Sequence, residues 1–156
     1  MYITVREITS ADVPVLLDVV HAAFEEYRGR LDPPSGAHSE TTESLRRELA
    51  GAYALAALAE GEIVGCIFYK PYKQYLYLYR LAVLPSHRRR GLGLALIAAV
   101  EQRARQLGLH RVRLNVRVAL TENRAYYERL GYRLVDYAVH KGYMRPTYFI
   151  LEKEVS

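Results

Sequence analysis

The sequence predicts an α/β (α+β) fold in a single domain, residues 1–156. Segments with apolar residues at every second position alternate along the chain with segments whose apolar residues recur every three or four positions. The 156 residues, 51% of them apolar, are enough for one full hydrophobic core. We find no internal repeat or linker in this pattern. We therefore expect one compact domain of strands and helices.

The first part of the chain predicts a strand, a helix and a loop. Residues 2–8 alternate as in a strand. Residues 13–27 carry apolar side chains at helical spacing, and Ser10 or Asp12 provides a cap before them. Residues 28–39 contain two glycines and two prolines, which predict a loop.

A second helix and a hairpin follow. Residues 41–49 predict a short helix. Two apolar strands, 53–59 and 63–69, flank a turn at residues 60–62, and this spacing is typical of a β-hairpin. Pro71 is expected to break the chain after the hairpin.

The second half of the chain begins with a strand and a long helix. Residues 75–83 have apolar side chains on both faces, as expected for a central, buried strand. The next helix ends at Gly108 and turns Glu101 and its polar neighbours outward. Its buried stripe consists of Leu92, Leu96, Ala99, Val100, Ala104 and Leu107. A strand, a short helix and two further strands are then predicted at residues 111–116, 122–130, 132–139 and 147–153.

Charge is concentrated in one part of the chain. The total is +5, but residues 88–133 hold eleven Lys or Arg and three Asp or Glu, so their charge is +8 and the remainder carries −3. Such a local positive field suits a polyanionic ligand, either nucleic acid or a phosphorylated small molecule. A solvated helix face rich in arginine would give the same composition.

Cysteine content and hydropathy limit the function classes. The single Cys66 lies in an apolar strand and can form neither an internal disulfide nor a metal cluster, so we expect a buried, inert thiol and no metal site. The N-terminus lacks the features of a secretory signal, and the apolar runs are about half the ~20 residues of a membrane span. These features predict a soluble, cytoplasmic protein with no membrane partner.

A glycine turn at residues 85–93 lies between the predicted central strand and the long helix. Free N–H groups and the positive end of the helix dipole meet at such a junction, which makes it an anion site. Gly91 and Gly93 let phosphate oxygens approach the backbone, and three arginines precede them. The turn lacks the third glycine of the dinucleotide fingerprint and the Gly-Lys-Ser/Thr of the P-loop. Phosphate binding is therefore predicted, and nucleoside triphosphate chemistry is disfavoured.

Two motifs resemble those of the GNAT superfamily of N-acetyltransferases. Arg88-Arg89-Arg90-Gly91-Leu92-Gly93, with Arg80-Leu81-Ala82-Val83-Leu84-Pro85 before it, is similar to the family's Gln/Arg-x-x-Gly-x-Gly/Ala turn and its lead-in strand. Tyr127-Glu128 with Gly131-Tyr132 resembles the family's Tyr-Glu-x-x-Gly-Phe/Tyr signature. Asn123 lies four residues before the tyrosine, whereas the common form of the signature has Asn seven before it, where this chain has Leu120.

The resemblance implies a fold, a donor and a set of site residues. It implies a mixed, mostly antiparallel sheet of six to seven strands flanked by about four helices. Acetyl-CoA would be the acyl donor, a primary amine the acceptor of direct transfer, and Tyr127 the general acid that protonates the leaving thiolate. A homodimer would be in keeping with the family. The implied cofactor-binding residues are Leu81, Ala82, Val83, Arg88, Arg89, Arg90, Gly91, Leu92, Gly93, Leu94 and Asn123.

Several questions stay open at the level of sequence. No carboxylate lies on the central strand, so the general base is unassigned among Glu25, Glu26 or a tyrosine acting through water. Tyr75, Tyr77 and Tyr79 share one face of that strand and either line the acceptor pocket or pack under a helix. The acceptor itself is not identified. The alternatives to an enzyme are a non-catalytic acyl-CoA sensor and a nucleic-acid-binding module, although no nucleic acid is expected.

Overall fold

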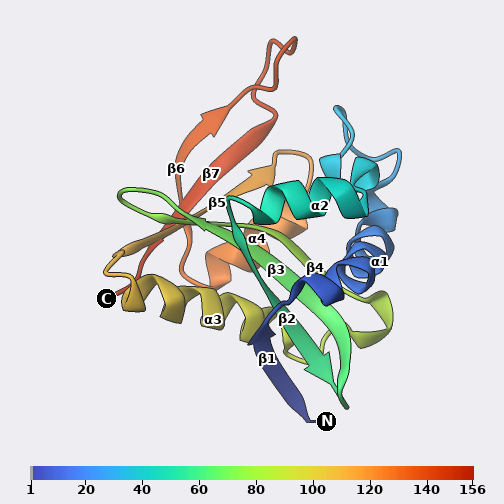
Figure 1. Cartoon of the computed structure of the whole chain (residues 1–156). Helices are drawn as coiled ribbons and strands as arrows, with labels where there is room; N and C mark the ends of the chain where they lie inside the picture. The colour runs from blue at the N-terminus through green and yellow to red at the C-terminus, as the bar shows by residue number, and fades with distance from the viewer. Residues whose placement is uncertain (1) are drawn as a thin grey trace. The chain divides into compact units, whose positions relative to one another are not determined.

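The computed structural model describes residues 2–156, which form seven strands in one sheet and four α-helices (Figure 1). The strand order is β1-β2-β3-β4-β5-β7-β6, and the sheet is mixed, because β4 and β5 are parallel whereas β1–β2, β2–β3, β5–β7 and β6–β7 are antiparallel. The predicted architecture is confirmed. In chain order the elements are β1 (Ile3–Glu7), α1 (Val13–Phe24), α2 (Thr42–Leu49), β2 (Tyr53–Ala59), β3 (Glu62–Pro71), β4 (Leu76–Val83), α3 (Leu92–Gln106), β5 (Arg111–Arg117), α4 (Thr121–Arg129), β6 (Arg133–Ala138) and β7 (Tyr148–Glu154).

The chain divides into two compact units. The first contains the chain up to Lys70 together with Leu78–Gln102, and the second contains Pro71–Tyr77 and Arg103–Ser156. None of the helices between residues 2 and 156 is both long and apolar enough to cross a membrane.

The hairpin of β2 and β3 forms as predicted. Glu60 and Gly61 occupy the turn with φ of 51° and 83°. Two consecutive left-handed residues give a two-residue turn whose twist matches that of the strands. The strand ends at Pro71, where the sequence predicts a break, although Pro71 itself is still the last residue of β3.

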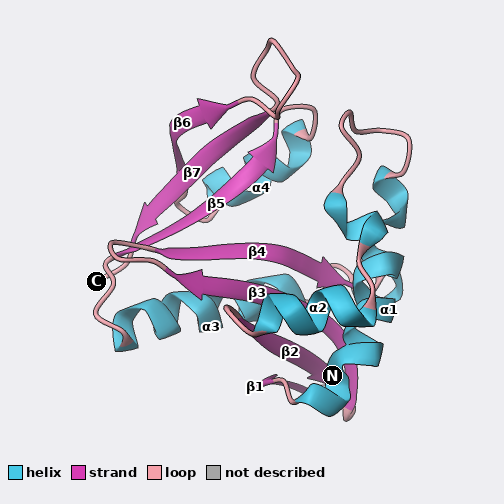
Figure 2. Cartoon of the chain, turned by 45° about the horizontal axis from the view of Figure 1, so that its top comes forward, coloured by secondary structure: helices cyan, strands magenta, loops and turns pink. Residues whose placement is uncertain are grey.

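The core of the first unit lies between the strands and the helices α1 and α2. Leu16 and Val20 of α1 and Leu45 of α2 are fully buried there, together with Phe68 and Cys66 of β3. Burial raises the pKa of the Cys66 thiol to about 12, so the prediction of an inert cysteine is confirmed. Figure 2 shows α1, α2 and these strands.

Helix α3 packs on the opposite face of β3. Side chains alternate along a strand, so Gly65 faces away from Cys66. A Cβ at Gly65 would lie 3.4 Å from Leu96 Cδ1 and 3.1 Å from the Ala82 carbonyl oxygen. A side chain at this position would therefore be crowded by α3 and β4, and the contacting atoms would have to shift by a few tenths of an ångström.

The predicted apolar stripe of α3 is confirmed at four of its six positions. Leu92, Leu96, Val100 and Ala104 are buried, whereas Ala99 is only partly buried and Leu107 is 44% exposed. Glu101, predicted on the polar side, is only 7% exposed. The helix ends as expected: Gly108 has φ +73°, and the Leu109 N–H donates to the Ala104 carbonyl at 2.9 Å.

The second unit has a sheet with two unlike faces. Val116 of β5 and its partner Phe149 of β7 face α4, whose Arg124 guanidinium lies 4.6 Å from the centre of the Phe149 ring. The opposite face carries the alternating residues Arg113, Asn115 and Arg117 of β5, paired with Glu152, Ile150 and Tyr148 of β7. This second face is therefore polar and contains most of the ionisable groups of the sheet.

Candidate functional site

The glycine turn before α3 has the backbone shape that anion binding requires. After the short 3-10 helix Pro85–His87, Arg89 has φ +63° and Gly91 has φ +82°. A left-handed residue on each side of Arg90 turns successive N–H groups toward one side of the chain. The first helical hydrogen bond of this turn runs from the Ala95 N–H to the Gly91 carbonyl, so the N–H groups before Ala95 are those that a helix leaves without an intrahelical partner.

The space around Gly91 is open. A Cβ at this position would meet no atom within 4 Å, and Leu92 beside it is buried and fixes the start of the helix. α3 has 15 residues, long enough for its dipole to favour an anion at its N-terminus. The turn can therefore accept a phosphate against the backbone.

The three arginines of the turn are not equivalent. The Arg88 guanidinium points to α1, where it pairs with the Glu26 carboxylate and donates to the Ala23 carbonyl at 2.9 Å. Its side chain thus fastens the turn to α1, and any ligand contact of this residue would come from its backbone. Arg89 and Arg90 are exposed. Ser86 and His87, which precede them, hydrogen-bond to each other at 2.8 Å.

The end of β4 leads directly into this turn. Arg80 has φ +54°, a left-handed conformation that interrupts the regular strand before Leu81. Within residues 2–156, parallel pairing with β5 joins Leu76 and Tyr77 to Val112 and Arg113. Residues 81–83 follow the paired positions along β4.

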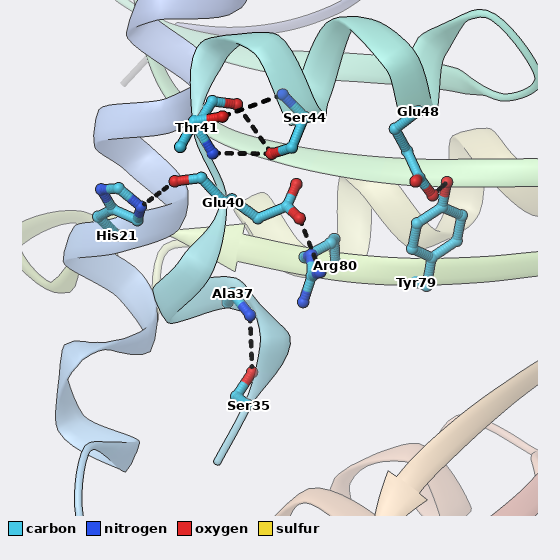
Figure 3. Close-up of polar contacts among 9 residues, drawn as sticks. All are labelled: His21, Ser35, Ala37, Glu40, Thr41, Ser44, Glu48, Tyr79 and Arg80. Atoms are coloured by element: carbon cyan, nitrogen blue, oxygen red, sulfur yellow. Dashed lines mark hydrogen bonds and ion pairs between the residues drawn. The ribbon is translucent and has the colours of Figure 1, made fainter.

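The loop before α2 and α2 itself are fixed on β4 by two acidic side chains (Figure 3). Glu40 Oε1 lies 3.4 Å from Arg80 Nη2, and the Tyr79 hydroxyl donates to Glu48 Oε1 at 2.5 Å. The Arg80 guanidinium also passes over Gly36, where a Cβ would lie 3.4 Å from it. The two residues just before Leu81 are thus both held by the segment that includes α2.

Hydrogen bonds also join the loop before α2 to α1 and cap the start of α2. The His21 Nε2 donates to the Glu40 carbonyl at 2.9 Å. Thr41 caps α2, because its Oγ1 accepts from the Ser44 N–H while Ser44 Oγ accepts from the Thr41 N–H (Figure 3). Residues 36–39 form a 3-10 helix that the sequence analysis treated as loop.

The three tyrosines predicted on one face of the central strand make different contacts; Tyr77 and Tyr79 lie in β4, and Tyr75 directly precedes it. The Tyr75 ring stacks under the Arg113 guanidinium at 4.3 Å, and the Tyr77 hydroxyl accepts from Asn115 Nδ2 at 3.2 Å. Tyr79 packs on Phe68 and binds Glu48. Each tyrosine therefore has a polar or cationic partner, as expected of rings that pack with their hydroxyls at an edge.

Tyr127 lies in α4, in a cluster of aromatic rings. Its ring makes edge contacts with Tyr126 at 5.3 Å and Tyr132 at 5.9 Å. Tyr132 is buried, and the preceding Gly131 has φ +99° and lies so close to Lys153 that a Cβ would be 3.3 Å from Cε. The Gly-Tyr pair after the helix therefore has a physical role, which is to reverse the chain and pack a second ring against Tyr127.

The predicted site residues fall into two groups. Those from Leu81 to Leu94 belong to the first unit, and Asn123 and Tyr127 belong to the second. Asn123 and Tyr127 are one turn apart on α4 and are both half-buried. Sequence reasoning missed Glu40 and Arg80, because their pairing joins a loop to a strand 40 positions later and no local pattern marks it.

The two candidate bases at the end of α1 both pair with arginines. Glu25 accepts from Arg28 at 2.9 Å, and this hydrogen bond lowers the pKa of the Glu25 carboxyl. Glu26 pairs with Arg88 of the turn. The Arg28 guanidinium thus favours the ionised form of Glu25, and the Glu26 carboxylate is engaged by Arg88.

Comparison with known proteins identifies the family. The model of the acetyltransferase (GNAT) family matches residues 17–132, which include the whole glycine turn, Asn123 and Tyr127. A curated protein of Danio rerio, "Probable N-acetyltransferase 14", is 36% identical over 91 residues. This match covers 57% of the present chain and 32% of the relative, so the chain corresponds to about a third of that protein's length.

Solved structures share the fold. The PaiA N-acetyltransferase of Thermoplasma acidophilum, solved in complex with coenzyme A, superposes with a TM-score of 0.84 at 22% identity and 99% coverage of both chains. A GNAT family acetyltransferase of Elizabethkingia anophelis with acetyl-CoA bound has a TM-score of 0.72 at 19% identity and 97% coverage of both chains. With most of its length matched by the family model, the chain belongs to the GNAT family of acetyltransferases.

Proposed function

We propose that the protein is one acetyltransferase domain, residues 1–156, that transfers the acetyl group of acetyl-CoA directly to a primary amine. The observation that carries this proposal is the turn before α3, in which Arg89 and Gly91 are left-handed and the space at Gly91 is open. Coenzyme A has a pyrophosphate, and a helix N-terminus with free N–H groups is a suitable receptor for it. The residues present therefore fit this donor.

The residues that would hold the donor lie on consecutive segments. The backbone of Arg88, Arg89 and Arg90 and the start of α3 at Gly91–Leu94 would bind the pyrophosphate. The peptide groups of Leu81, Ala82 and Val83 would bind the pantetheine arm. Asn123, half-buried in the first turn of α4, would add a polar contact. The relatives that were solved with coenzyme A or acetyl-CoA support this choice of donor.

Acetyl-CoA supplies a thioester carbonyl that a neutral amine can attack. An N–H of the 81–83 segment would polarise the carbonyl oxygen. As the amine nitrogen bonds to the carbonyl carbon and the C–S bond breaks, the Tyr127 hydroxyl would donate its proton to the sulfur. The proton lost by the amine nitrogen would pass to solvent, and solvent would return a proton to the tyrosine. A thiol has a pKa of about 8.5, so this acid needs to give only modest assistance.

Calorimetric titration with coenzyme A tests the binding half of the proposal. Gly91→Glu and Gly93→Glu should abolish binding, because each adds a carboxylate where the pyrophosphate would lie. Normal binding in both variants would contradict the assignment of the turn.

Kinetics of Tyr127→Phe test the chemical half. We expect kcat to fall by about ten- to a hundredfold with little change in the Kd of coenzyme A, since the ring still packs against Tyr126 and Tyr132. Unchanged turnover across the pH range would remove Tyr127 from the mechanism. Binding of acetyl-CoA without acetylation of any amine in a broad panel would instead favour an acyl-CoA sensor.

The arginine-rich segment, residues 88–133, supports the nucleic-acid alternative less well than it supports an acetyltransferase. Arg88 pairs with Glu26, Arg113 with Glu152 and Arg124 with Glu128, so much of the positive charge is locally balanced. A nucleic-acid surface needs cations that are available to phosphates. We propose a small-molecule or peptide amine as the partner instead, and a cytoplasmic homodimer as the working state.

A further inference from the structure

A cavity of about 430 Å³ lies within the first unit. Three segments line it: the chain from the end of β1 to the start of α1, the last turn of α2, and the start of β2. Figure 2 shows these elements together in the lower half of the view. Neither the turn before α3 nor residues 81–83 line the cavity. Its volume suits a small organic molecule, and it is separate from the residues assigned to the donor.

The floor of this cavity is apolar and belongs to the main core of the unit. Val13 and Ala54 are buried, and Ile8 and Leu49 are partly buried against the same cluster. The Ile8 N–H donates to the Ala54 carbonyl at 3.2 Å, so these two backbone groups are engaged with each other. Such a floor favours the apolar part of a ligand.

One wall of the cavity is a face of α2 that carries a cation. Arg46, Leu49 and Ala50 are three and four positions apart, so they lie on the same side of the helix. Arg46 is exposed, and among residues 2–156 its guanidinium has no acidic partner. Ser10, just before α1, adds a hydroxyl to the lining. A guanidinium presents paired N–H donors that match a carboxylate or a phosphate.

Glu7 also lines the cavity, but its carboxylate lies on the other face of the sheet. Phe68 belongs to the core cluster beside α1 and α2, so the next residue, Tyr69, faces the opposite side. Glu7 Oε1 lies 3.5 Å from the Tyr69 hydroxyl, and the Tyr53 ring stacks on Tyr69 at 5.4 Å. Glu7 and Tyr53 therefore contribute backbone to the cavity, and the Glu7 carboxylate does not neutralise Arg46.

We propose that this cavity binds a small apolar molecule that ends in one anionic group, a carboxylate or a phosphate monoester. The apolar body would lie against Ile8, Val13 and Leu49, and the anionic group would bind the Arg46 guanidinium. Asp12, the carboxylate nearest to Ser10 in sequence, is bound by Arg6 at 2.8 Å and so is already engaged. The site goes beyond the proposed function, because no step of acetyl transfer uses these residues.

Titration with octanoate, octyl phosphate and octanamide tests the site without any acetyl transfer. NMR follows the methyl groups of Ile8 and Leu49 at constant ionic strength. We expect saturable shifts with an anionic probe, and a Kd about tenfold higher for octanamide, which has the same chain without the charge. The tighter of the two anions identifies the anionic group. Acetate, which has the charge without the chain, should not displace octanoate.

Two neighbouring arginines of α2 provide a test variant and its matched control. Arg46→Gln should raise the Kd of the anionic probe about tenfold and remove its advantage over octanamide. Arg47→Gln changes the next residue, which is also exposed but does not line the cavity, and should bind the probes as the wild type does. Because both side chains are exposed, we expect both variants to fold, and their Tm values check this.

Four results would overturn the site. These are shifts at Ile8 and Leu49 that do not saturate, equal Kd values for the anionic probes and octanamide, wild-type binding in Arg46→Gln, and equal weakening in both arginine variants. Coenzyme A is titrated as a further arm, and its displacement of octanoate from these methyl groups would assign the cavity to the donor and overturn the proposal. Failure of the proposed function would appear as a lack of acetyl transfer, which none of these binding measurements requires.

Discussion

Replacing Gly91 by alanine tests the proposed binding of coenzyme A at the turn before α3 with a single added carbon. Gly91 has φ +82° and no atom within 4 Å of a Cβ built on it. The methyl group therefore causes no clash, and its cost is the strain of an L-residue in the left-handed region, about 1–2 kcal/mol. The same carbon occupies the space through which a phosphate oxygen would reach the N–H groups. We expect the Kd of coenzyme A to rise at least tenfold, which is about 1.4 kcal/mol.

Gly108→Ala is the matched control for this experiment. Gly108 has φ +73°, also lies in open space and ends the same helix, so alanine there causes a similar strain without touching the turn. Both variants should lose about 1–2 kcal/mol in urea denaturation, or about 2–8 °C in Tm. Calorimetry should show weaker coenzyme A binding only for Gly91→Ala. Equal Kd values for Gly91→Ala and the wild type, or equal weakening in both variants, would refute the reasoning.

Three further predictions concern stability and reactivity. The Arg6 guanidinium holds the pKa of the Asp12 carboxyl below its usual range, so the ion pair stabilises the fold above the unfolded pKa of about 3.9. Asp12→Asn should therefore cost about 1 kcal/mol at pH 7 and progressively less as the pH falls from 5 toward 2, and a constant difference in urea denaturation would contradict this. Cys66, whose pKa is raised to about 12, should react with a thiol reagent at pH 8 only in denaturant; rapid labelling of the native protein would disprove its burial. Gly65→Ala should destabilise the protein by about 1–3 kcal/mol, because its Cβ would lie 3.1 Å from the Ala82 carbonyl oxygen. A loss of stability below about 0.5 kcal/mol would mean that β3 and β4 can move apart to admit the methyl group.

The elements that sequence predicted well are those whose signals are local. The hairpin turn, the end of α3 and the turn before α3 each contain a glycine, Gly61, Gly108 or Gly91, which tolerates left-handed backbone. Apolar periodicity likewise places the start of α3 within one turn, and Leu92 is buried as expected. These features depend on a few neighbouring residues, so they can be predicted from a single sequence.

The features that sequence did not predict depend on contacts between distant segments. The left-handed Arg80 and its ion pair with Glu40, like that of Arg88 with Glu26, join residues 40 or more positions apart. Glu101 is buried although its helical position is typical of a polar face, since burial is decided by what packs on the helix. The side-chain role of Arg88 is the clearest case, because the motif suggested a ligand contact while the structure directs the guanidinium to α1.

The arginines beside α1 also bear on how the acceptor loses its proton. An ionised carboxylate that is stabilised by a cation gains less from taking up a proton, so Glu25, whose pKa the Arg28 guanidinium lowers, is a weak base at neutral pH. Glu26 is bound to Arg88 and would have to leave that ion pair before it could act. Three candidates for the general base follow from the sequence: Glu25, Glu26 and a tyrosine acting through water. The contacts with Arg28 and Arg88 make the two glutamates weaker candidates and leave the tyrosine unaffected. A base of this kind needs an amine that is already neutral in part, so we expect the rate to rise with pH until the acceptor amine is deprotonated.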